Sequence, residues 1–439
     1  MAHSNDRLAS AAAVLAVCNG LWSTFCVHAS LMGMQRMLDT RRTSSAREFG
    51  GVDDRTIVVV VPVLHEADRV RECAAHWSRF LEEEQRLRLC FVTTERERAE
   101  MPDQQFTWDA ILSDPRYERL AVEGRANIMH YPSVNRTYAE QLGWALDQLA
   151  DDPEIDYFYV SNADSRLSAD GCAEIVELAN SGIECAQQSA LFFAKLSDAT
   201  LTAVGEAFYQ SRWTFEIELF RYMAGSGKFR WLPRLLSDNW YQHAVGHGLL
   251  LRRTQYELLG RLPRPRYGLE DAALGFAIRA HGGRIRPFAT LECGEPPASA
   301  RELQRQRATW IRGPLCAPEY VKSRREAGIA AQAIYSGCKW AFGIPAQWAL
   351  LAALPARQRR IAAAGLVLGL YGPIFRLLIG VRGLEIVTRP SGIDIARGLT
   401  GYPVAAVSCW LGGFRGLCRL FIDLAYNKPA MQQRTRGLP

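Results

Sequence analysis

The chain has 439 residues, 48% of them hydrophobic and 22% charged, which excludes both a disordered polymer and a wholly membrane-embedded protein. Its net charge of +6 is modest, and much of the arginine excess lies near apolar segments, which favours membrane lipids as partners and argues against nucleic acid. The 11 cysteines are scattered and form no Cys-x-x-Cys pair, which favours reduced thiols and a cytosolic domain over a disulfide framework.

The N-terminal segment is typical of a membrane anchor. Leu8–Gln35 contains no Asp, Glu, Lys or Arg, and at about 1.5 Å per residue a helix of this length crosses a bilayer core of about 30 Å. Basic residues follow within Arg36–Arg47, whereas only Asp6 and Arg7 precede, so the positive-inside rule places the next domain in the cytoplasm. A signal peptide, the alternative, would carry its basic residues before the apolar run. We expect residues 1–50 to form a transmembrane anchor with a basic linker.

The last third of the chain contains three further apolar stretches, at 327–355, 361–381 and 401–424. Basic residues interrupt each of them, and these either snorkel toward the interface or face a protein-lined path and contact a lipid phosphate. Gly343 and Pro345 make the first stretch a candidate re-entrant or interfacial segment, and Asp423 makes the third the weakest candidate to span. The basic loop 355–360 contradicts the positive-inside rule if all three cross. We expect three or four spans in total, with 326–439 as a membrane region of interfacial and transmembrane helices.

Residues 51–325 alternate between strand and helix patterns. The expected strands lie at 56–61, within 88–100 (running into a polar loop), at 125–132 and within 156–164, and the expected helices begin near Glu66 and cover 137–150. This alternation predicts an open α/β sheet that is mostly parallel, with ligands bound at the carboxyl ends of its strands. Neither Gly-x-Gly-x-x-Gly nor Gly-x-x-x-x-Gly-Lys occurs, so the dinucleotide fingerprint and the P-loop are not supported.

Five short motifs follow one another in this region. They are "PVLHE" (62–66), "TYAEQLGWAL" (137–146), "SNADSR" (161–166), the segment 246–285 with its Glu270-Asp271 pair, and "QRATWIRGP" (306–314). In this order, over residues 56–315, they resemble motifs of the family-2 glycosyltransferases, inverting enzymes of the GT-A fold. The resemblance implies a GT-A nucleotide-sugar-binding domain with a mixed, mostly parallel sheet, flanked by N- and C-terminal transmembrane helices.

The chain departs from the family pattern at several positions. His65 replaces the Asn of Pro-x-x-Asn-Glu, Asn162 replaces the first acid of Asp-x-Asp, and Thr309 replaces the Arg of Gln-x-x-Arg-Trp. Tyr138 and Gly143 replace the Lys and Asn of the intervening helix. These changes keep open a second class of function, a non-catalytic glycosyltransferase-like membrane subunit that binds a sugar-nucleotide or a partner. Because the second acid of the metal motif, the Glu-Asp pair and the Trp remain, we expect an active enzyme.

The resemblance implies a divalent cation, Mg²⁺ or Mn²⁺, that neutralises the departing diphosphate. Asp164 is the expected metal ligand. Asn162 supplies no charge, but its carbonyl accepts a hydrogen bond from a ribose hydroxyl or ligates the metal. Because Asn, Asp and Ser all favour turns, a capped strand-to-loop turn is the alternative interpretation of Asn162–Ser165.

Asp271 is the expected general base of the reaction. It would take the proton from the acceptor hydroxyl as that oxygen attacks the anomeric carbon opposite the leaving group, a proton transfer that contributes about 10²–10⁴-fold. Glu270 would orient this carboxylate or the acceptor. The alternatives are a helix N-cap for Asp271 and a solvated loop acid for Glu270.

The remaining candidates for substrate binding are Pro62, Glu66, Glu95, Asn162, His247, Gln306, Arg307, Trp310 and Arg312. Glu66 and Glu95 suit recognition of a ribose or a base, and the alternative for both is a helix cap. His247 lies between two glycines, where a substrate approaches the backbone, or is a buried structural histidine. Trp310 suits stacking on an acceptor sugar, with a tryptophan at lipid headgroup depth as the alternative. One of the two arginines would reach the diphosphate in place of the missing one.

The sequence therefore predicts a membrane-bound inverting glycosyltransferase with its catalytic domain at the cytoplasmic face of the cell membrane. It would move a sugar from a nucleoside-diphosphate sugar to a lipid-linked or polysaccharide acceptor. Family habit favours UDP as the nucleotide, and the small number of spans leans toward limited addition to a lipid-linked acceptor.

Overall fold

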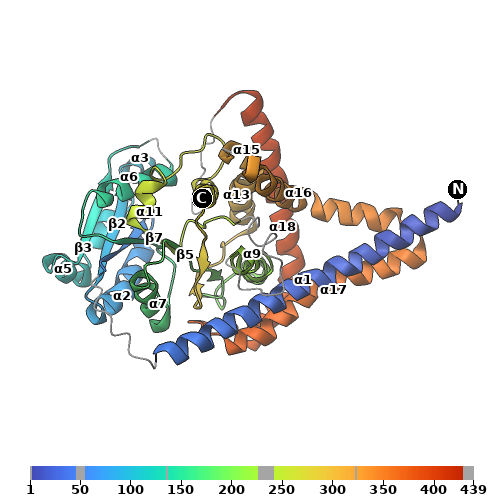
Figure 1. Cartoon of the computed structure of the whole chain (residues 1–439), viewed down its shortest axis with the longest axis horizontal. Helices are drawn as coiled ribbons and strands as arrows, with labels where there is room; N and C mark the ends of the chain where they lie inside the picture. Colours follow the sequence, from blue (N-terminus) through green and yellow to red (C-terminus); the bar gives the residue numbers. More distant parts are fainter. Residues whose placement is uncertain (1, 46–54, 135–136, 226–241, 322–323, 429–439) are drawn as a thin grey trace.

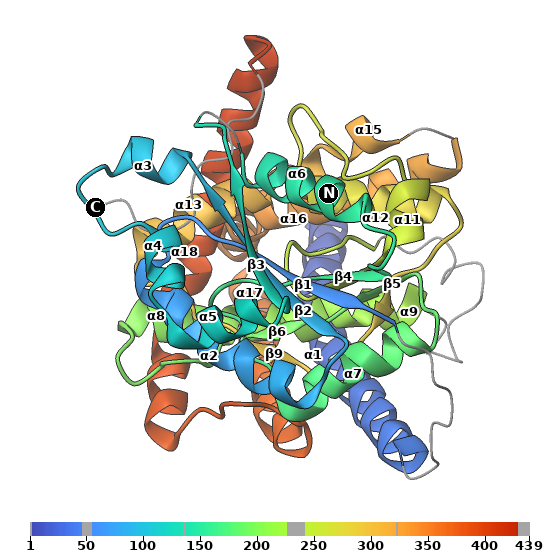
Figure 2. The same cartoon turned by 90° about the vertical axis from the view of Figure 1, so that its left-hand side faces the viewer.

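The computed structural model describes residues 2–45, 55–134, 137–225, 242–321 and 324–428. Figure 1 shows an α/β body at one end of the molecule and long helices that project away from it toward the N-terminus. The body carries a central sheet, which Figure 2 shows from the side that faces away from the projecting helices.

Within the described residues, the central sheet has seven strands in the order β3-β2-β1-β4-β7-β5-β8. Their bounds are Ile57–Pro62 (β1), Leu87–Thr94 (β2), Ala126–Tyr131 (β3), Tyr157–Val160 (β4), Cys185–Gln187 (β5), Leu249–Arg252 (β7) and Arg286–Pro287 (β8). Strands β1 to β4 form a parallel block, β7 is antiparallel to β4 and β5, and β8 is parallel to β5. The sheet is mixed and mostly parallel. A smaller sheet pairs β6 (Ala190–Leu191) with β9 (Glu292–Cys293).

Helices cover both faces of the central sheet. In the body they are α2 (Ala67–Glu83), α3 (Arg96–Glu100), α4 (Thr107–Leu112), α5 (Pro115–Val122), α6 (Tyr138–Ala150), α7 (Ala169–Asn180), α11 (Arg253–Leu258) and α12 (Glu270–Ala280). Alternate residues of β1 face two different cores, because Val59 packs with α2 and α7 whereas Val58 and Val60 pack with α6 and α12. Burial on both faces explains why this strand is a continuous run of β-branched residues.

The strands and helices expected from the sequence up to β4 are confirmed, with one correction. The polar stretch after β2 was expected to be a loop, but Arg96–Glu100 forms the short helix α3. Glu97 of this helix is buried and accepts hydrogen bonds from the backbone and hydroxyl of Thr107 at 3.0 and 2.8 Å. The charged stretch after β2 looks solvent-exposed in the sequence, but its Glu97 holds α3 against α4.

The second half of the chain adds a helical layer between the body and the projecting helices. It consists of α8 (Leu201–Trp213), the π-helix η1 (Thr214–Leu219), α9 (Phe220–Gly225), α13 (Ala300–Trp310), α14 (Arg312–Leu315), α15 (Ala317–Tyr320) and α16 (Arg324–Ala353), which contains Pro345. The division of the chain at residues 50 and 325 stays a prediction. Helices α8 and α13, which precede residue 325, pack against α18, which follows it.

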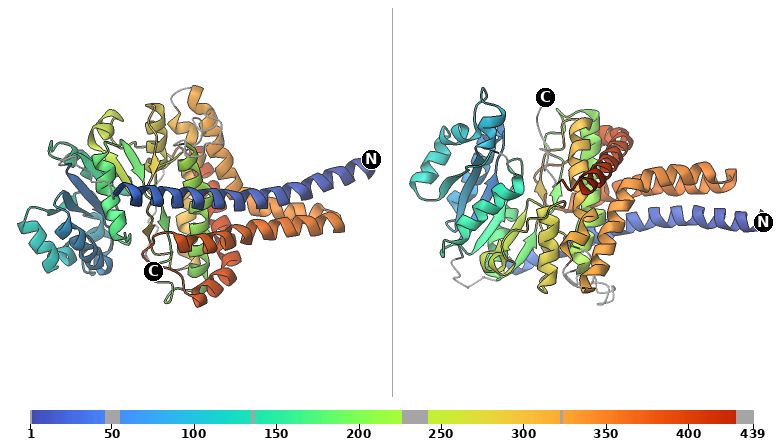
Figure 3. Two further views of the ribbon diagram at one scale, coloured as in Figure 1. Left: turned by 60° about the horizontal axis from the view of Figure 1, so that its bottom comes forward. Right: turned by 90° about the horizontal axis from the view of Figure 1, so that it is seen from above.

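Among the described residues, three helices are long and apolar enough to cross a membrane, which indicates membrane association. The candidate spans are Asp6–Thr43 in α1 (Ala2–Ser45), Ala356–Gly383 over α17 (Ala356–Gly380) and the 3-10 helix η2 (Val381–Gly383), and Gly392–Ala425, which is α18. α1 and α17 lie side by side along their length (Figures 1 and 3). At their crossing, a Cβ added to Gly20 would lie 2.6 Å from the carbonyl oxygen of Gly365, and Gly369 lies on the same face. This small-xxx-small packing is typical of membrane helices.

Figures 1 and 3 both show that helix α18 runs steeply across the direction of α1 and α17. Its glycines face the helical layer: a Cβ added to Gly412 would lie 2.6 Å from the carbonyl oxygen of Gln304 in α13. Its outward face keeps Phe421 and Ile422 exposed beside Arg415 and Arg419. An apolar outer face with interspersed arginines is typical of a helix that lies in the membrane interface.

Candidate active site

A cavity of about 360 Å³ opens at the carboxyl ends of β1, β2 and β4. The predicted site residues that line it are Pro62, Glu66, Asn162, Asp164, His247, Glu270, Asp271, Gln306, Arg307 and Trp310. The chain therefore brings together residues that are up to 248 positions apart (310 minus 62). Glu95 and Arg312 are not among the lining residues.

The end of β1 makes the first wall of the cavity. After Pro62 the chain turns, and His65 adopts a left-handed backbone with φ of 56°. His tolerates this conformation better than most residues, which suits it to this turn. The next residue, Glu66, begins α2 without a side-chain capping bond; its carboxylate instead accepts a hydrogen bond from Arg69 at 3.0 Å.

The stretch "SNADSR" forms a tight turn after β4. The amide of Ser165 donates to the carbonyl of Asn162 at 3.2 Å, and the Arg166 guanidinium donates to the carbonyls of Ala163 and Ser165 at 2.8 and 2.9 Å. Arg166 therefore holds the turn, and the Asn162 side chain is left facing the cavity with no hydrogen bond to any described residue. Asp164 is buried, and its Oδ2 accepts the amide of Glu295 at 3.2 Å.

A glycine-flanked histidine makes the opposite wall. Gly248 has a φ of +65°, and a Cβ there would collide with the carbonyl of Gln188, so this position requires glycine. Tyr138 fixes the other side of the loop by donating to the carbonyl of Gly246 at 3.1 Å. His247 forms an ion pair through Nδ1 with the buried carboxylate of Glu292. Burial disfavours the imidazolium, but Glu292 outweighs it and raises the pKa of His247.

The donor set near Asp164 fits a hard divalent cation in part. Within the described residues, no three His, Cys, Asp or Glu side chains converge at metal-binding distance. However, Oε2 of Glu292 is buried at the cavity without a hydrogen-bond partner, and Asp164 lies close enough to raise the pKa of His247. One carboxylate with an unpartnered carboxylate oxygen nearby suits Mg²⁺ or Mn²⁺, which take one or two protein carboxylates and fill the remaining positions with substrate phosphates and water.

Glu270 and Asp271 begin α12, and the loop before them is firmly anchored. The Tyr320 hydroxyl accepts the amide of Leu269 at 2.9 Å, and the Glu319 carboxylate accepts the amide of Gly268 at 3.1 Å. The N-cap of α12 is Leu269, so the N-cap interpretation of Asp271 is wrong. Asp271 does accept the amide of Ala272 at 2.6 Å, and it faces the cavity. Burial, followed by the nearby charge of Glu270, raises the pKa of Asp271 well above its ordinary value.

The far end of the cavity is aromatic and belongs to the helical layer. Trp310 of α13 and Trp340 of α16 line it, and the Arg307 guanidinium lies 4.3 and 5.8 Å from their ring centroids. Gln306 is buried here, and its Oε1 has no hydrogen-bond partner among the described residues. A buried amide oxygen without a protein partner at a cavity wall indicates a ligand-binding position, since buried polar groups are normally satisfied.

Arg307 and Arg312, the two candidates for diphosphate binding, both form ion pairs with acidic side chains. Arg307 is buried and forms an ion pair with Glu206 of α8, and Arg312 is buried and pairs with Asp423 of α18. Glu95 pairs with His130 at 2.9 Å on the surface of the body. Of these three, only Arg307 reaches the cavity wall.

Glu218 and Arg221 are among the cavity residues that the sequence analysis did not single out. Glu218 of the π-helix η1 accepts a hydrogen bond from Ser189 at 2.5 Å, and burial raises its pKa to about 7. Arg221 of α9 lines the cavity and donates to the Ser336 hydroxyl at 3.0 Å. A π-helical turn is rare and occurs often at functional sites, but hydropathy patterns do not reveal it. The sequence signal was slight: Glu216, Glu218 and Arg221 are three charges inside an otherwise apolar segment.

No protein-family model matches the chain, and no curated protein matches it. Among solved structures, the chain is similar to a mannosyltransferase from Pyrobaculum calidifontis in complex with GDP-Man and Mn²⁺, with 15% identity and a TM-score of 0.47 over 92% of this chain and 99% of that one. It is also similar to S. aureus TarS 1-349 in complex with UDP-GlcNAc, with 8% identity and a TM-score of 0.38 over 80% and 91% of the two chains. Similarity at this level identifies neither the substrate nor the reaction of this chain.

Proposed function

We propose that this protein is a membrane-bound inverting glycosyltransferase of the GT-A type that moves a sugar from a nucleoside-diphosphate sugar to a lipid-linked or polysaccharide acceptor. The observation that carries the proposal is the convergence of the five motif segments on one cavity. Asp164 and Asp271 both face it, from the strand-end turn and from the start of α12.

Asp271 acts as the general base. Its raised pKa gives it the proton affinity that a base near neutral pH requires, because burial and Glu270 both disfavour its charged form. The anchors at Tyr320 and Glu319 hold α12 in place while the carboxylate takes the acceptor proton. Glu270 keeps this proton affinity high.

The diphosphate end of the donor lies between the Asp164 turn and the His247 loop. Asp164 would hold a divalent cation, which when bound neutralises diphosphate charge as the leaving group departs. The charged imidazolium of His247 and the guanidinium of Arg221 supply positive charge at the same cavity, in the place of the arginine that the family motif has at position 309. Asn162 contacts the nucleotide through its free side-chain amide.

The acceptor enters from the aromatic end. Trp310 and Trp340 present ring faces for a sugar, and Gln306 presents an unpartnered carbonyl oxygen for a hydroxyl. This end belongs to helices that pack against the membrane helices, which favours a lipid-linked acceptor delivered from the cytoplasmic leaflet of the cell membrane.

The test uses the full chain solubilised in mild detergent, with Mn²⁺, and a panel of UDP- and GDP-sugars. Release of nucleoside diphosphate is measured for the wild type, for Asp271→Asn and for the surface control Asp198→Asn. Loss of the base should lower turnover by about 10²–10⁴-fold, whereas the control should match the wild type. A wild type that binds nucleotide but never turns over any donor would overturn this function in favour of a non-catalytic subunit.

A further inference from the structure

The carboxylate of Asp164 is itself held by the segment that follows β9. The backbone amide of Glu295 donates to Oδ2 of Asp164 at 3.2 Å. Two residues further along, Arg166 and Cys293 exchange a pair of backbone hydrogen bonds at 2.9 and 2.8 Å. The turn that carries Asp164 and the segment 293–295 are therefore joined at three points, and a shift of that segment would change the orientation of the carboxylate.

The side chain of Glu295 is held from two directions. Arg69 of α2 donates through Nε to Oε2 of Glu295 at 3.2 Å, and Nζ of Lys195 lies 3.0 Å from Oε1. Each carboxylate oxygen thus has its own cation, and the Glu295 side chain is 14% exposed. Because both oxygens are engaged in charge-assisted contacts, the carboxylate cannot rotate without breaking an ion pair.

Both cations also contact further acids on α2. Arg69 donates to Glu66 at 3.0 Å, and Lys195 donates to Glu72 at 3.0 Å. Glu66, Arg69 and Glu72 follow one another at intervals of three residues, which places them along one face of the helix. Glu72 accepts a further hydrogen bond from Arg166 at 3.3 Å. The network therefore starts on α2, passes through the segment after β9 and returns to the turn after β4.

Lys195 has a backbone conformation that lysine rarely adopts. Its φ is 52°, in the left-handed region that favours glycine. Hydrogen bonds to Glu295 and then to Glu72 raise the pKa of Lys195, so its side chain remains a charged ammonium. A strained backbone at a residue with two carboxylate partners indicates that the ammonium has a role that glycine could not supply.

We propose that Glu295 is a positioning residue for the metal site, and that Lys195 and Arg69 hold it in place. The amide of Glu295 fixes one oxygen of Asp164, and the ion pairs fix Glu295 against α2. Removal of a group that orients a metal ligand typically lowers metal affinity by about 10–100-fold. The inference rests on the divalent cation that the proposed function assigns to Asp164.

The experiment measures Mn²⁺ binding to the full chain in detergent by calorimetry, with UDP or GDP present and no turnover involved. Glu295→Gln keeps the backbone amide but removes the charge that the two cations hold, so the Kd for Mn²⁺ should rise by about tenfold. Lys195→Gly should raise this Kd by a smaller factor. Lys195→Arg keeps the positive charge and should bind Mn²⁺ nearly as tightly as the wild type does.

Thermal unfolding of the same variants separates positioning from folding. Glycine suits the left-handed backbone at position 195, and an exposed ion pair adds little to stability. Lys195→Gly should therefore unfold at or above the wild-type temperature, although it binds Mn²⁺ more weakly. A merely structural lysine would leave the Mn²⁺ affinity unchanged.

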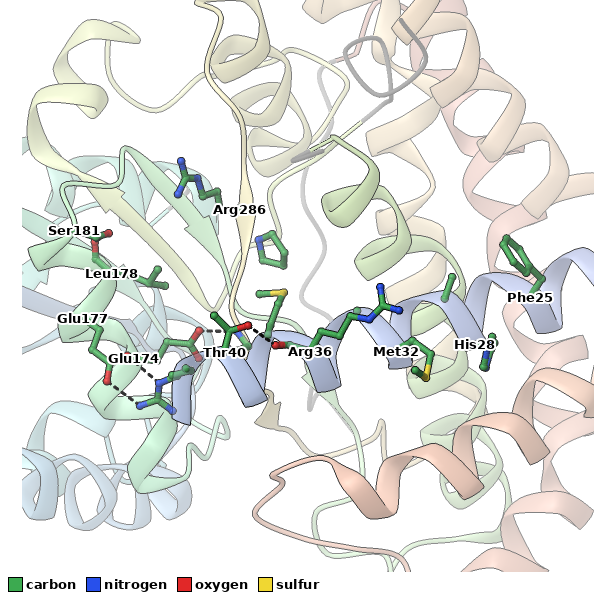
Figure 4. A pocket seen from close by; sticks show the side chains of 16 residues that line it. Phe25, His28, Met32, Arg36, Thr40, Glu174, Glu177, Leu178, Ser181 and Arg286 are labelled. Carbon is green, nitrogen blue, oxygen red and sulfur yellow. Dashed lines mark hydrogen bonds and ion pairs between the residues drawn. The ribbon is translucent and has the colours of Figure 1, made fainter. Parts of the chain in front are cut away.

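Glu177→Gln is the matched control. Figure 4 shows Glu177 at a separate cavity of about 650 Å³, where it accepts two hydrogen bonds from Arg41 of α1 at 2.9 and 3.2 Å. This variant also removes a carboxylate that joins two segments of the chain. Because its cavity shares no lining residue with the candidate active site, the Mn²⁺ affinity should equal that of the wild type.

The outcomes distinguish this inference from the proposed function. If Asp164→Asn weakens Mn²⁺ binding but Glu295→Gln does not, the positioning role is overturned and the metal assignment stands. If Asp164→Asn binds Mn²⁺ as the wild type does, the metal assignment fails and the inference fails with it. An equal loss in Glu177→Gln would attribute the effect to the change in net charge and would also overturn the inference.

Discussion

The phenolic oxygen of Tyr138 lies 3.1 Å from the carbonyl oxygen of Gly246, and this hydrogen bond ties helix α6 to the loop that carries His247. Tyr138 therefore acts as an anchor for this loop. The phenol is half-buried near Glu270 and Asp271, and burial raises its pKa, so it stays a neutral donor.

Removal of this anchor should affect substrate binding more than folding. Tyr138→Phe loses one hydrogen bond, worth about 1 kcal/mol of unfolding free energy, and frees the loop that positions His247. We expect KM for the donor to rise several-fold while kcat changes less. Tyr256→Phe is the control, since its hydroxyl donates to Asp147 at 2.6 Å away from the cavity. An equal rise of KM in both variants would remove the positioning role of Tyr138.

The pH dependence of turnover should reveal the coupling between the two acids of α12. Asp271 must be ionised to act as a base, and burial with the charge of Glu270 raises its pKa, so activity should rise with pH through that raised pKa. Glu270→Gln removes the neighbouring charge and lowers the pKa of Asp271. It should therefore move the rising limb of the pH profile of kcat/KM to lower pH. The exposed-pair variant Glu257→Gln should leave the limb in place. A limb that stays fixed in Glu270→Gln contradicts the assignment.

Metal affinity should depend on Asp164. Calorimetric titration of Mn²⁺ in the presence of UDP should show binding by the wild type, and Asp164→Asn should weaken it by about tenfold or more. Chelation with EDTA should abolish transfer, and added Mn²⁺ should restore it. Asp170→Asn, on the surface of α7, is the control. Equal Mn²⁺ affinity in Asp164→Asn would take this carboxylate out of the coordination shell.

The ion pair of Arg307 and Glu206 should be a strong determinant of stability. Both side chains are nearly inaccessible, at 2% and 1% exposure, so Glu206→Gln leaves a buried charge without its partner and should cost about 3–5 kcal/mol of unfolding free energy. The double variant Glu206→Gln/Arg307→Met should recover part of this loss. For comparison, Arg88→Met breaks an exposed pair with Glu154 and should change stability by less than about 0.5 kcal/mol. Thermal unfolding in detergent measures all three.

The contact between α1 and α17 should tolerate no larger residue at Gly365. A Cβ at this position would lie 2.6 Å from the amide nitrogen of Val17, so Gly365→Leu must push the helices apart. We expect a destabilisation of about 1–3 kcal/mol and a lower yield of folded protein. Gly328→Leu is the matched control, because a Cβ there meets nothing within 4 Å. A similar loss in both variants would assign the effect to leucine itself.

The sequence predicts the strand ends and the motif residues on them because local rules decide both. A run of β-branched residues such as 57–61 is a buried strand in any context, and parallel strands bring their carboxyl ends to one edge. Asp164 is therefore placed at the cavity by the topology, whereas Asp271 reaches it through a loop that Tyr320 and Glu319 anchor. The left-handed backbone of His65 follows from the same local preferences.

The partners of charged residues could not be predicted, because they are set by distant packing. Arg312 was a candidate for the diphosphate, yet its carboxylate partner is Asp423, 111 residues later, on a helix whose approach depends on glycine packing. Glu218 and Arg221 reach the cavity through a π-helical turn, which changes the face that each presents without any change in the hydropathy pattern. The sheet was likewise expected to be mostly parallel, but the position of β7, the strand that runs antiparallel to β4 and β5, depends on long-range contacts.

The glycine contacts of α18 have a mechanical consequence. Gly412 and Gly416 press against backbone carbonyls of α13, and Gly401 presses against the backbone of α8, with no side chain between to absorb a shift. Helix α13 also carries Gln306 and Trp310, which line one wall of the candidate active site. A displacement of α18 would therefore be transmitted to α13 through backbone contacts, without a rearrangement of side chains. If α18 contacts the bilayer and the cavity carries the proposed transfer, a bilayer change that displaces α18 would also displace Trp310, and we expect turnover to depend on the physical state of the membrane.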